Sequence, residues 1–112
     1  FRLCLTQVPE NRAPFPKPEG YDPAEFELLR RYLAAKPGLA VADILNPLSV
    51  NNGKTDTNNN GPFSTDVIGE SWDYPEASYE ERERIVQRHK RYTLGFLYFL
   101  ANDPAVPKAL QD

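Results

Sequence analysis

The chain has 112 residues, of which 40% are hydrophobic, and a formal net charge of −3. This length corresponds to one domain. The chain has no basic tract, which excludes a typical nucleic-acid-binding protein with a one-sided basic face. No apolar run approaches the ~18 residues needed to span a bilayer, and no signal peptide is visible. We therefore expect a soluble chain without nucleic-acid or membrane partners, in a compartment that the sequence does not indicate.

The N-terminal residues alternate, with Phe1, Leu3 and Leu5 on one side, which predicts a short strand over residues 1–6. Cys4 lies in this apolar context, so we expect a small buried hydrophobe, and as the only cysteine it has no internal disulfide partner. A strand at the very start of a chain normally pairs with another strand. This position and the lack of any methionine lead us to interpret residues 1–112 as a single segment excised from a larger protein.

A first helix is predicted over 23–35. Residues 22–25 read Asp-Pro-Ala-Glu, which combines a capping aspartate, a proline at the first helical position and a capping-box glutamate. Apolar residues then recur at helical spacing until a Lys-Pro-Gly sequence at 36–38. For residues 39–50 we predict a turn of helix or irregular backbone to about Leu45, followed by an extended stretch.

A second, longer helix is predicted over 79–102. Ser78 opens a capping box with Glu81 three residues later, and Asn-Asp-Pro at 102–104 ends the helix. Beyond Thr93 the helix is apolar on nearly every side, which indicates burial on every side. Two helices and one strand could not easily surround it, so we expect its neighbours to lie in parts of the protein outside this segment.

The coil between the strand-like and helical parts is also expected to be ordered. Apolar and turn-forming residues mix over 62–77, and Trp72, Tyr74 and Tyr79 are interpreted as packing residues rather than a sugar-binding surface. The predicted fold class is α+β and mainly helical. It has two principal helices at about 23–35 and 79–102, a short N-terminal strand and long ordered coil.

The most distinctive stretch is residues 51–61, which contain no apolar side chain. Such a run cannot bury itself by hydrophobicity, so it must be solvated, held by side-chain hydrogen bonds, or wrapped around a ligand. Three interpretations stay open. The plainest is a polar surface loop with the turn dipeptides Asn52-Gly53 and Asn60-Gly61.

The second interpretation is a calcium loop. Asp56, Asn58 and Asn60, followed by Gly61, match the first six positions of the EF-hand pattern. Position twelve, where a bidentate glutamate belongs, is Val67, so the match is incomplete. A calcium-binding or other non-enzymatic interaction module is therefore the alternative function.

The third interpretation is a binding loop that faces a cofactor or a polar substrate. Its candidate residues are Lys54, Thr55, Asp56, Asn58 and Asn59. Lysine can meet an anion, aspartate can accept hydrogen bonds from hydroxyls, and asparagine and threonine both donate and accept. This inventory suits a sugar, a ribityl chain or a carboxylated small molecule.

His89, the only histidine, lies on the apolar stripe of the second predicted helix. A hydrogen-bonded boundary histidine is the plainer interpretation, and a catalytic base is the alternative. A metal site built on several histidines is excluded by the count, and no cysteine cluster replaces it.

Several motifs follow one another over nearly the whole chain: Phe-Arg-Leu-Cys-Leu-Thr at 1–6, Gly-Tyr-Asp at 20–22, Asn-Gly-Lys-Thr-Asp-Thr-Asn-Asn at 52–59, Phe-Ser-Thr-Asp at 63–66, Tyr-Pro-Glu-Ala at 74–77 and Asp-Pro-Ala-Val-Pro at 103–107. In this order they resemble the interior of bacterial FAD-dependent oxidoreductases, some of which are labelled xanthan lyases.

The resemblance implies a segment of the substrate domain, with FAD bound in the full-length protein and the FAD-binding domain of the same chain as the partner. No Gly-x-Gly-x-x-Gly fingerprint occurs here, so we expect no FAD binding and no activity from this segment alone. The run 54–59 is then the part expected to approach the flavin or a sugar-like substrate, and His89 is the lesser candidate.

Overall fold

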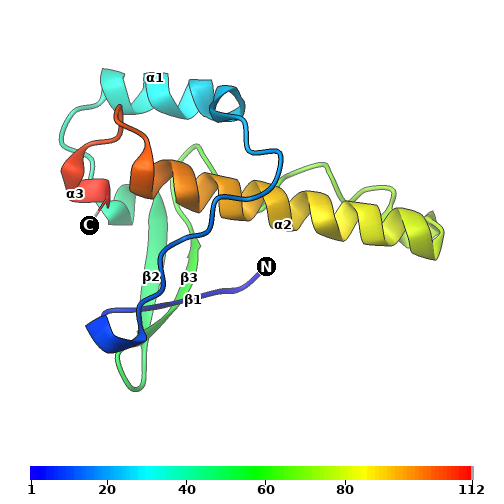
Figure 1. Ribbon diagram of the computed structural model, residues 1–112, viewed down its shortest axis with the longest axis horizontal. Helices are drawn as coiled ribbons and strands as arrows, with labels where there is room; N and C mark the ends of the chain where they lie inside the picture. The colour runs from blue at the N-terminus through cyan, green and yellow to red at the C-terminus, as the bar shows by residue number, and fades with distance from the viewer. Residues whose placement is uncertain (112) are drawn as a thin grey trace.

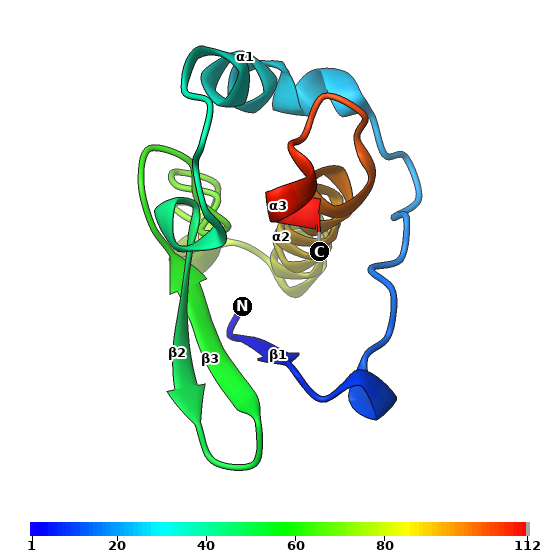
Figure 2. The same cartoon turned by 90° about the vertical axis from the view of Figure 1, so that its left-hand side faces the viewer.

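One long helix, α2 (Tyr79–Asn102), runs almost the whole length of the molecule in the computed structural model, which describes residues 1–111 (Figure 1). Two shorter helices, α1 (Glu27–Ala35) and α3 (Lys108–Gln111), accompany its C-terminal half. A small sheet lies on the side of α2 away from α1, as Figure 2 shows end-on. The predicted α+β fold class, with its two principal helices, is confirmed.

α2 begins and ends where the sequence predicts, and α1 ends at the predicted Ala35 but begins at Glu27, after a 3₁₀ turn. Ser78 Oγ accepts a hydrogen bond from the Glu81 backbone N–H at 3.3 Å, and Glu81 Oε2 accepts one from the Ser78 backbone N–H at 2.9 Å, which completes the predicted capping box. In the first helix, residues Pro23–Phe26 form a 3₁₀ turn before α1 begins. Asp22 Oδ1 caps this turn by accepting from the Ala24 N–H at 2.9 Å.

The sheet has three antiparallel strands in the order β1 (Leu3–Thr6), β3 (Lys54–Asn59) and β2 (Leu45–Val50). The predicted N-terminal strand and the predicted extended stretch to Val50 are therefore both present. β3 is the central strand, because it pairs with β1 on one side and β2 on the other.

The expectation of a loop over 51–61 is wrong for most of its length, because β3 occupies it. Neighbouring strands satisfy the backbone hydrogen bonds of β3, so the segment needs no apolar residues of its own to be ordered. The β-branched residues Thr55 and Thr57 take the inner positions, where they are buried and their hydroxyls hydrogen-bond at 2.7 Å. Asn52 and Gly53 take positive φ angles of 64° and 67° in the hairpin turn that precedes β3.

The C-terminal half of α2 is enclosed by this chain itself, so the expected need for neighbours from outside is wrong. Phe96 and Phe99 have 0% exposure. Close packing also brings α2 against the start of the first helix, since a Cβ on Gly95 would lie 3.2 Å from the ring of Phe26. Other residues of this core come from α1, from β2 and the residue before it, and from the C-terminal segment: Leu29, Leu33, Ile44, Leu45, Val106 and Leu110.

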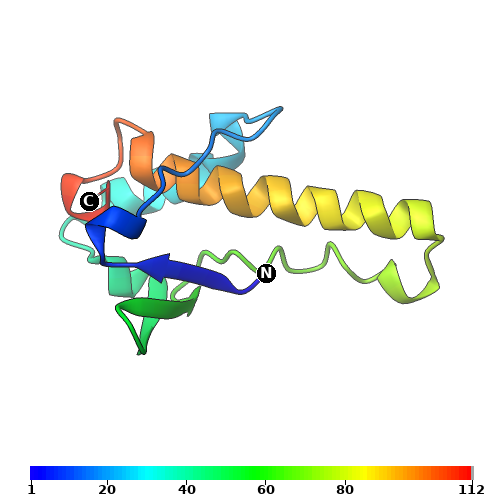
Figure 3. The same ribbon diagram turned by 60° about the horizontal axis from the view of Figure 1, so that its bottom comes forward.

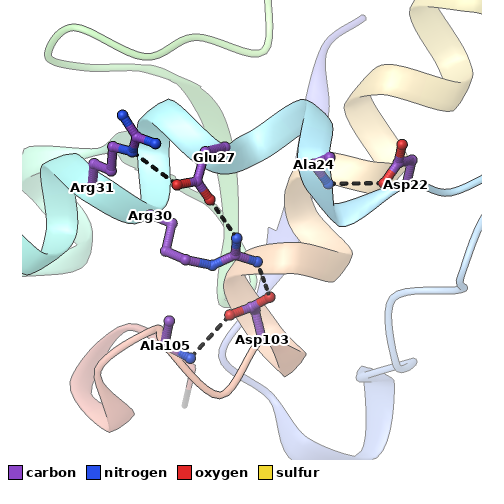
Figure 4. Close-up of polar contacts among 7 residues, drawn as sticks. All are labelled: Asp22, Ala24, Glu27, Arg30, Arg31, Asp103 and Ala105. Atoms are coloured by element: carbon purple, nitrogen blue, oxygen red, sulfur yellow. Dashed lines mark hydrogen bonds and ion pairs between the residues drawn. The ribbon is translucent and has the colours of Figure 1, made fainter.

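Arg30 ties α1 to the end of α2 (Figure 4). Its guanidinium donates to Glu27 Oε2 at 2.6 Å and to Asp103 Oδ2 at 2.9 Å, and it lies 5.5 Å from the ring centre of Phe99. Asp103 Oδ1 in turn accepts from the Ala105 N–H at 2.9 Å. The hydrogen bonds to Asp103 and Glu27 raise the pKa of Arg30 further above its ordinary value.

The N-terminal half of α2 projects from this core together with the coil that runs beside it, and Figure 3 shows the two as a narrow extension. We call residues 66–92 the arm. Within it, Trp72, Tyr74 and Tyr79 are exposed, so their expected packing role is wrong. Cys4 is likewise exposed rather than buried, because strand alternation turns it away from the core. Within residues 1–111, no helix has both the length and the apolar character needed to cross a bilayer.

Candidate functional site

β3 divides the predicted binding residues between two faces of the sheet. Successive side chains of a strand point to opposite faces, so Lys54, Asp56 and Asn58 share one face while Thr55 and Asn59 share the other. Lys54 and Asn58 are exposed and Asp56 is half-buried, whereas Thr55 is buried. We call the first face the outer face of β3. The structure thus brings three of the five predicted residues together and separates the other two from them.

Asp56 lies in the middle of the outer face. Its register partners are Cys4 on β1 and Leu48 on β2. Its carboxylate forms an ion pair with Arg2, whose Nε donates to Oδ1 at 3.2 Å. The pair is exposed, so its contribution to stability is small, about 0–1 kcal/mol. For the site, the pair means that the Asp56 carboxylate already has a cation beside it.

Lys54 is the cation of the outer face that no carboxylate neutralises: among residues 1–111 it forms no ion pair. Asn58 uses its Oδ1 atom to accept a hydrogen bond from the Asn59 N–H at 2.9 Å. Its amide nitrogen is therefore the group that it can offer to a ligand. The outer face combines an ammonium group, a carboxylate paired with Arg2 and an amide donor.

Thr55 is committed to the fold. Its hydroxyl hydrogen-bonds to that of Thr57 on the inner face of the sheet. We therefore assign Thr55 to folding rather than to direct ligand contact.

The extended backbone of β3 argues against the EF-hand interpretation of Asp56, Asn58 and Asn60. Alternate residues of a strand advance by about 6.8 Å, whereas calcium ligands converge to within about 2.6 Å of one ion. Asn60 also binds the backbone, because its side-chain amide donates to the Ala42 carbonyl at 2.6 Å. Over residues 1–111, no three His, Cys, Asp or Glu side chains gather as a metal site.

His89 lies on α2, whereas the other candidate residues lie on β3. Its Nδ1 atom lies 2.8 Å from the Ile85 carbonyl, one turn earlier, so this nitrogen carries the proton and donates. The ring is half-buried. This hydrogen bond agrees with the boundary histidine that the sequence suggested as the plainer interpretation.

A shallow groove that the sequence did not reveal lies between α2, the arm coil and the 3₁₀ turn Pro23–Phe26. Arg88 donates to Glu70 at 2.7 Å and Arg91 donates to Glu25 at 2.8 Å across it. Tyr92 also lines the groove, and burial raises the pKa of its hydroxyl. Both guanidinium groups already bind carboxylates, so a ligand would have to displace one of them. Residues so far apart in sequence leave no local signal of such a groove.

The described residues do not fit the pyrophosphate of FAD. Dinucleotide sites place the pyrophosphate at a free helix N-terminus that follows a parallel strand. Here the sheet is antiparallel, and the carboxylate of Glu81 already lies at the N-terminus of α2, where Ser78 hydrogen-bonding lowers its pKa. Asp22 occupies the start of the first helix in the same way. A second anion at either end would meet a negative charge.

Comparison with known proteins identifies the class. The family model described as FAD dependent oxidoreductase matches residues 1–109, which is nearly the whole chain. The chain therefore belongs to this family, and the resemblance drawn from its motifs is confirmed at the level of the family. No curated protein and no solved structure matches the chain.

Proposed function

We propose that this chain is part of the substrate domain of a flavin-dependent oxidoreductase, in which the outer face of β3 contacts the flavin or a polar substrate. The observation that carries the proposal is the grouping of Lys54, Asp56 and Asn58 on one accessible face of the central strand. Membership of the FAD dependent oxidoreductase family supports the class of reaction.

Each of the three side chains has a role that follows from its surroundings. The ammonium of Lys54, which pairs with no carboxylate among residues 1–111, attracts an anionic group. Asp56, held by Arg2, accepts hydrogen bonds from hydroxyl groups, and the amide nitrogen of Asn58 donates one. Side chains about 6.8 Å apart along a strand suit a ligand several atoms long that lies parallel to β3. A sugar-like or carboxylated substrate, or the ribityl chain of the flavin, has this form.

The remaining groups of FAD belong, in this proposal, to a second part of the full-length polypeptide. The two carboxylate-capped helix starts support this division, since neither can accept the pyrophosphate. The partner of this chain is then the FAD-binding domain, and the shared site lies between that domain and the outer face.

Substitution in the full-length protein tests the proposal. Lys54→Ala and Asp56→Ala should each lower kcat/KM or the bound flavin content by about tenfold or more, because a hydrogen bond to a charged group contributes about 1.5–3 kcal/mol. Steady-state kinetics and flavin absorbance of the purified variants measure the two quantities.

Two further variants act as controls. Lys108→Ala removes another exposed lysine, on α3, and should leave both quantities unchanged. Arg2→Ala removes the ion pair but leaves the Asp56 carboxylate, so its effect should be smaller than that of Asp56→Ala. Wild-type kinetics and flavin content in both alanine variants of β3 would refute the role of the outer face.

A further inference from the structure

A second groove lies where the extended segment before the first helix crosses α2 (Figure 1). Its volume is about 350 Å³, near the lower end of the range for small-molecule sites. One wall is the turn Pro18–Tyr21, and the other is a stripe of α2 that carries Gln87, Lys90 and Leu94. These three residues follow one another at intervals of three and four positions, so they share one face of the helix.

The turn is fixed in place beside α2. The Tyr21 N–H donates to the Pro18 carbonyl at 3.2 Å, and Gly20 takes a positive φ of 69°, which glycine adopts readily at the third position of a tight turn. Arg91 donates to the Gly20 carbonyl at 3.2 Å and to Glu25 at 2.8 Å. This arginine therefore joins the two walls, and a carboxylate already neutralises its charge.

Two opposite charges line the groove without meeting. Glu19 lies at the second position of the turn and Lys90 lies on α2, and both side chains are exposed. Neither forms an ion pair within residues 1–111. The groove thus presents a carboxylate on one wall and an ammonium on the other. A simple anion would be repelled by the first and a simple cation by the second.

The groove also has an apolar part and a neutral acceptor. Pro18 and Leu94 are half-buried and contribute apolar surface to its lining. The Nε2 atom of Gln87 donates to Glu83 at 2.7 Å, so its Oε1 atom is the amide group that it can offer to a ligand. The matching ligand carries a carboxylate, an ammonium and an apolar group on one small skeleton.

We propose that this groove binds a small zwitterion with an apolar side chain, which is the chemistry of an apolar α-amino acid. The ligand carboxylate accepts from Lys90, its ammonium donates to Glu19, and its side chain lies against Pro18 and Leu94. Hydrogen bonds between charged groups are roughly twice as strong as neutral ones, so the two charged ends provide most of the affinity. The site shares no residue with the outer face of β3 and goes beyond the proposed function.

Isothermal titration calorimetry of the full-length protein with L-leucine tests the site. We expect a dissociation constant on the order of 1 mM, because both charged contacts are exposed to water. Isocaproate lacks the ammonium of leucine and isoamylamine lacks its carboxylate. Each should bind about fivefold more weakly or worse, since it loses one ion pair. Glycine, which lacks the apolar side chain, should also bind more weakly than leucine.

Substitutions locate the binding in the groove. Lys90→Gln and Glu19→Gln should each weaken leucine binding about fivefold. The matched controls Lys36→Gln and Glu10→Gln change exposed residues outside the groove and should leave the affinity unchanged. The exchanged variant, Glu19→Lys with Lys90→Glu, should recover part of the binding, because a zwitterion can turn around.

Three outcomes overturn the proposal. The first is the absence of saturable binding heat with leucine. The second is isocaproate that binds as tightly as leucine, which identifies a plain anion site. The third is wild-type affinity in both groove variants, which places leucine elsewhere in the full-length protein. Lys54→Ala should change turnover but keep leucine binding, so a failure of the outer-face proposal and a failure of this site appear in different measurements.

Discussion

The two halves of α2 lie in different environments although they form one uninterrupted helix. Beyond Thr93 the helix is enclosed by α1, the sheet and the C-terminal segment, and Phe96 and Phe99 are fully buried. Before that point it contacts the coil of the arm, which it holds through Arg82 and Arg88. The capping box at Ser78 fixes where the helix starts, but the packing around each half decides what that half does. The half beyond Thr93 buries most of its side chains and stabilises the molecule, whereas no side chain of α2 before Thr93 is fully buried.

The largest expected effect is a difference in the free energy of unfolding between variants in the two halves of α2. Phe99→Ala should lower the free energy of unfolding by about 3–5 kcal/mol, because it leaves a cavity in the core. Tyr79→Ala in the arm should change it by no more than about 0.5 kcal/mol, because the side chain is exposed. Urea denaturation followed by circular dichroism measures both. Similar losses for the two variants would contradict the division of the helix.

The junction at the end of α2 gives the next effect. The Asp103 side chain is only 9% exposed and binds both Arg30 and the Ala105 N–H. Asp103→Ala should cost about 1.5–3 kcal/mol, as hydrogen bonds to charged groups do. Asp103→Asn keeps an acceptor for the Ala105 N–H and should lose less in the same denaturation experiment. Equal losses would mean that the ion pair with Arg30 accounts for the whole effect and that the hydrogen bond from the Ala105 N–H contributes nothing.

A smaller and local effect is expected at the tip of the arm. Ser78→Ala removes the acceptor for the Glu81 N–H and should cost about 1 kcal/mol of helix stability. We expect the arm to open without the core, so the first turns of α2 should exchange amide hydrogens faster while residues 96–100 keep their protection. Faster exchange throughout α2 would show that the two halves unfold together.

The smallest expected effect is a pH dependence. Hydrogen bonds from Arg31 and Arg30 hold the pKa of Glu27 below its ordinary value of 4.5, and Ser78 lowers that of Glu81 in the same way. A depressed folded-state pKa contributes stability above pH 4.5 that is lost as the pH falls through the folded value. Glu27→Gln and Glu81→Gln should therefore each flatten the decline of the urea midpoint in acid. A decline as steep as that of the wild type would contradict the assigned hydrogen bonds.

The sequence predicted the helices well because their signals are local. The caps at Asp22 and Ser78 and the Asn-Asp-Pro stop at 102–104 act on neighbouring backbone groups, so they can be recognised without the fold. β3 could not be recognised in the same way, because it has no apolar alternation. Its inner positions are Thr55 and Thr57, and the strand exists because β1 and β2, distant in sequence, pair with it.

The placement of the candidate site residues could be predicted only in part for the same reason, and their role stays a prediction. Lys54, Asp56 and Asn58 were expected to act together and do share a face, but Thr55 and Asn59 were expected to join them and do not. Strand alternation alone makes that distinction. The exposure of Trp72 had no local signal either, because its neighbours Ser71 and Asp73 are the same whether the side chain points inward or outward.

The position of Trp72 has a practical consequence for spectroscopy. It is the only tryptophan in residues 1–112, and its indole ring already lies in water in the folded state. Intrinsic fluorescence of this segment should therefore change little when the core melts, although Phe96 and Phe99 lose all their packing. The same signal should shift toward the blue when the ring leaves water, so it would report on the arm and not on folding.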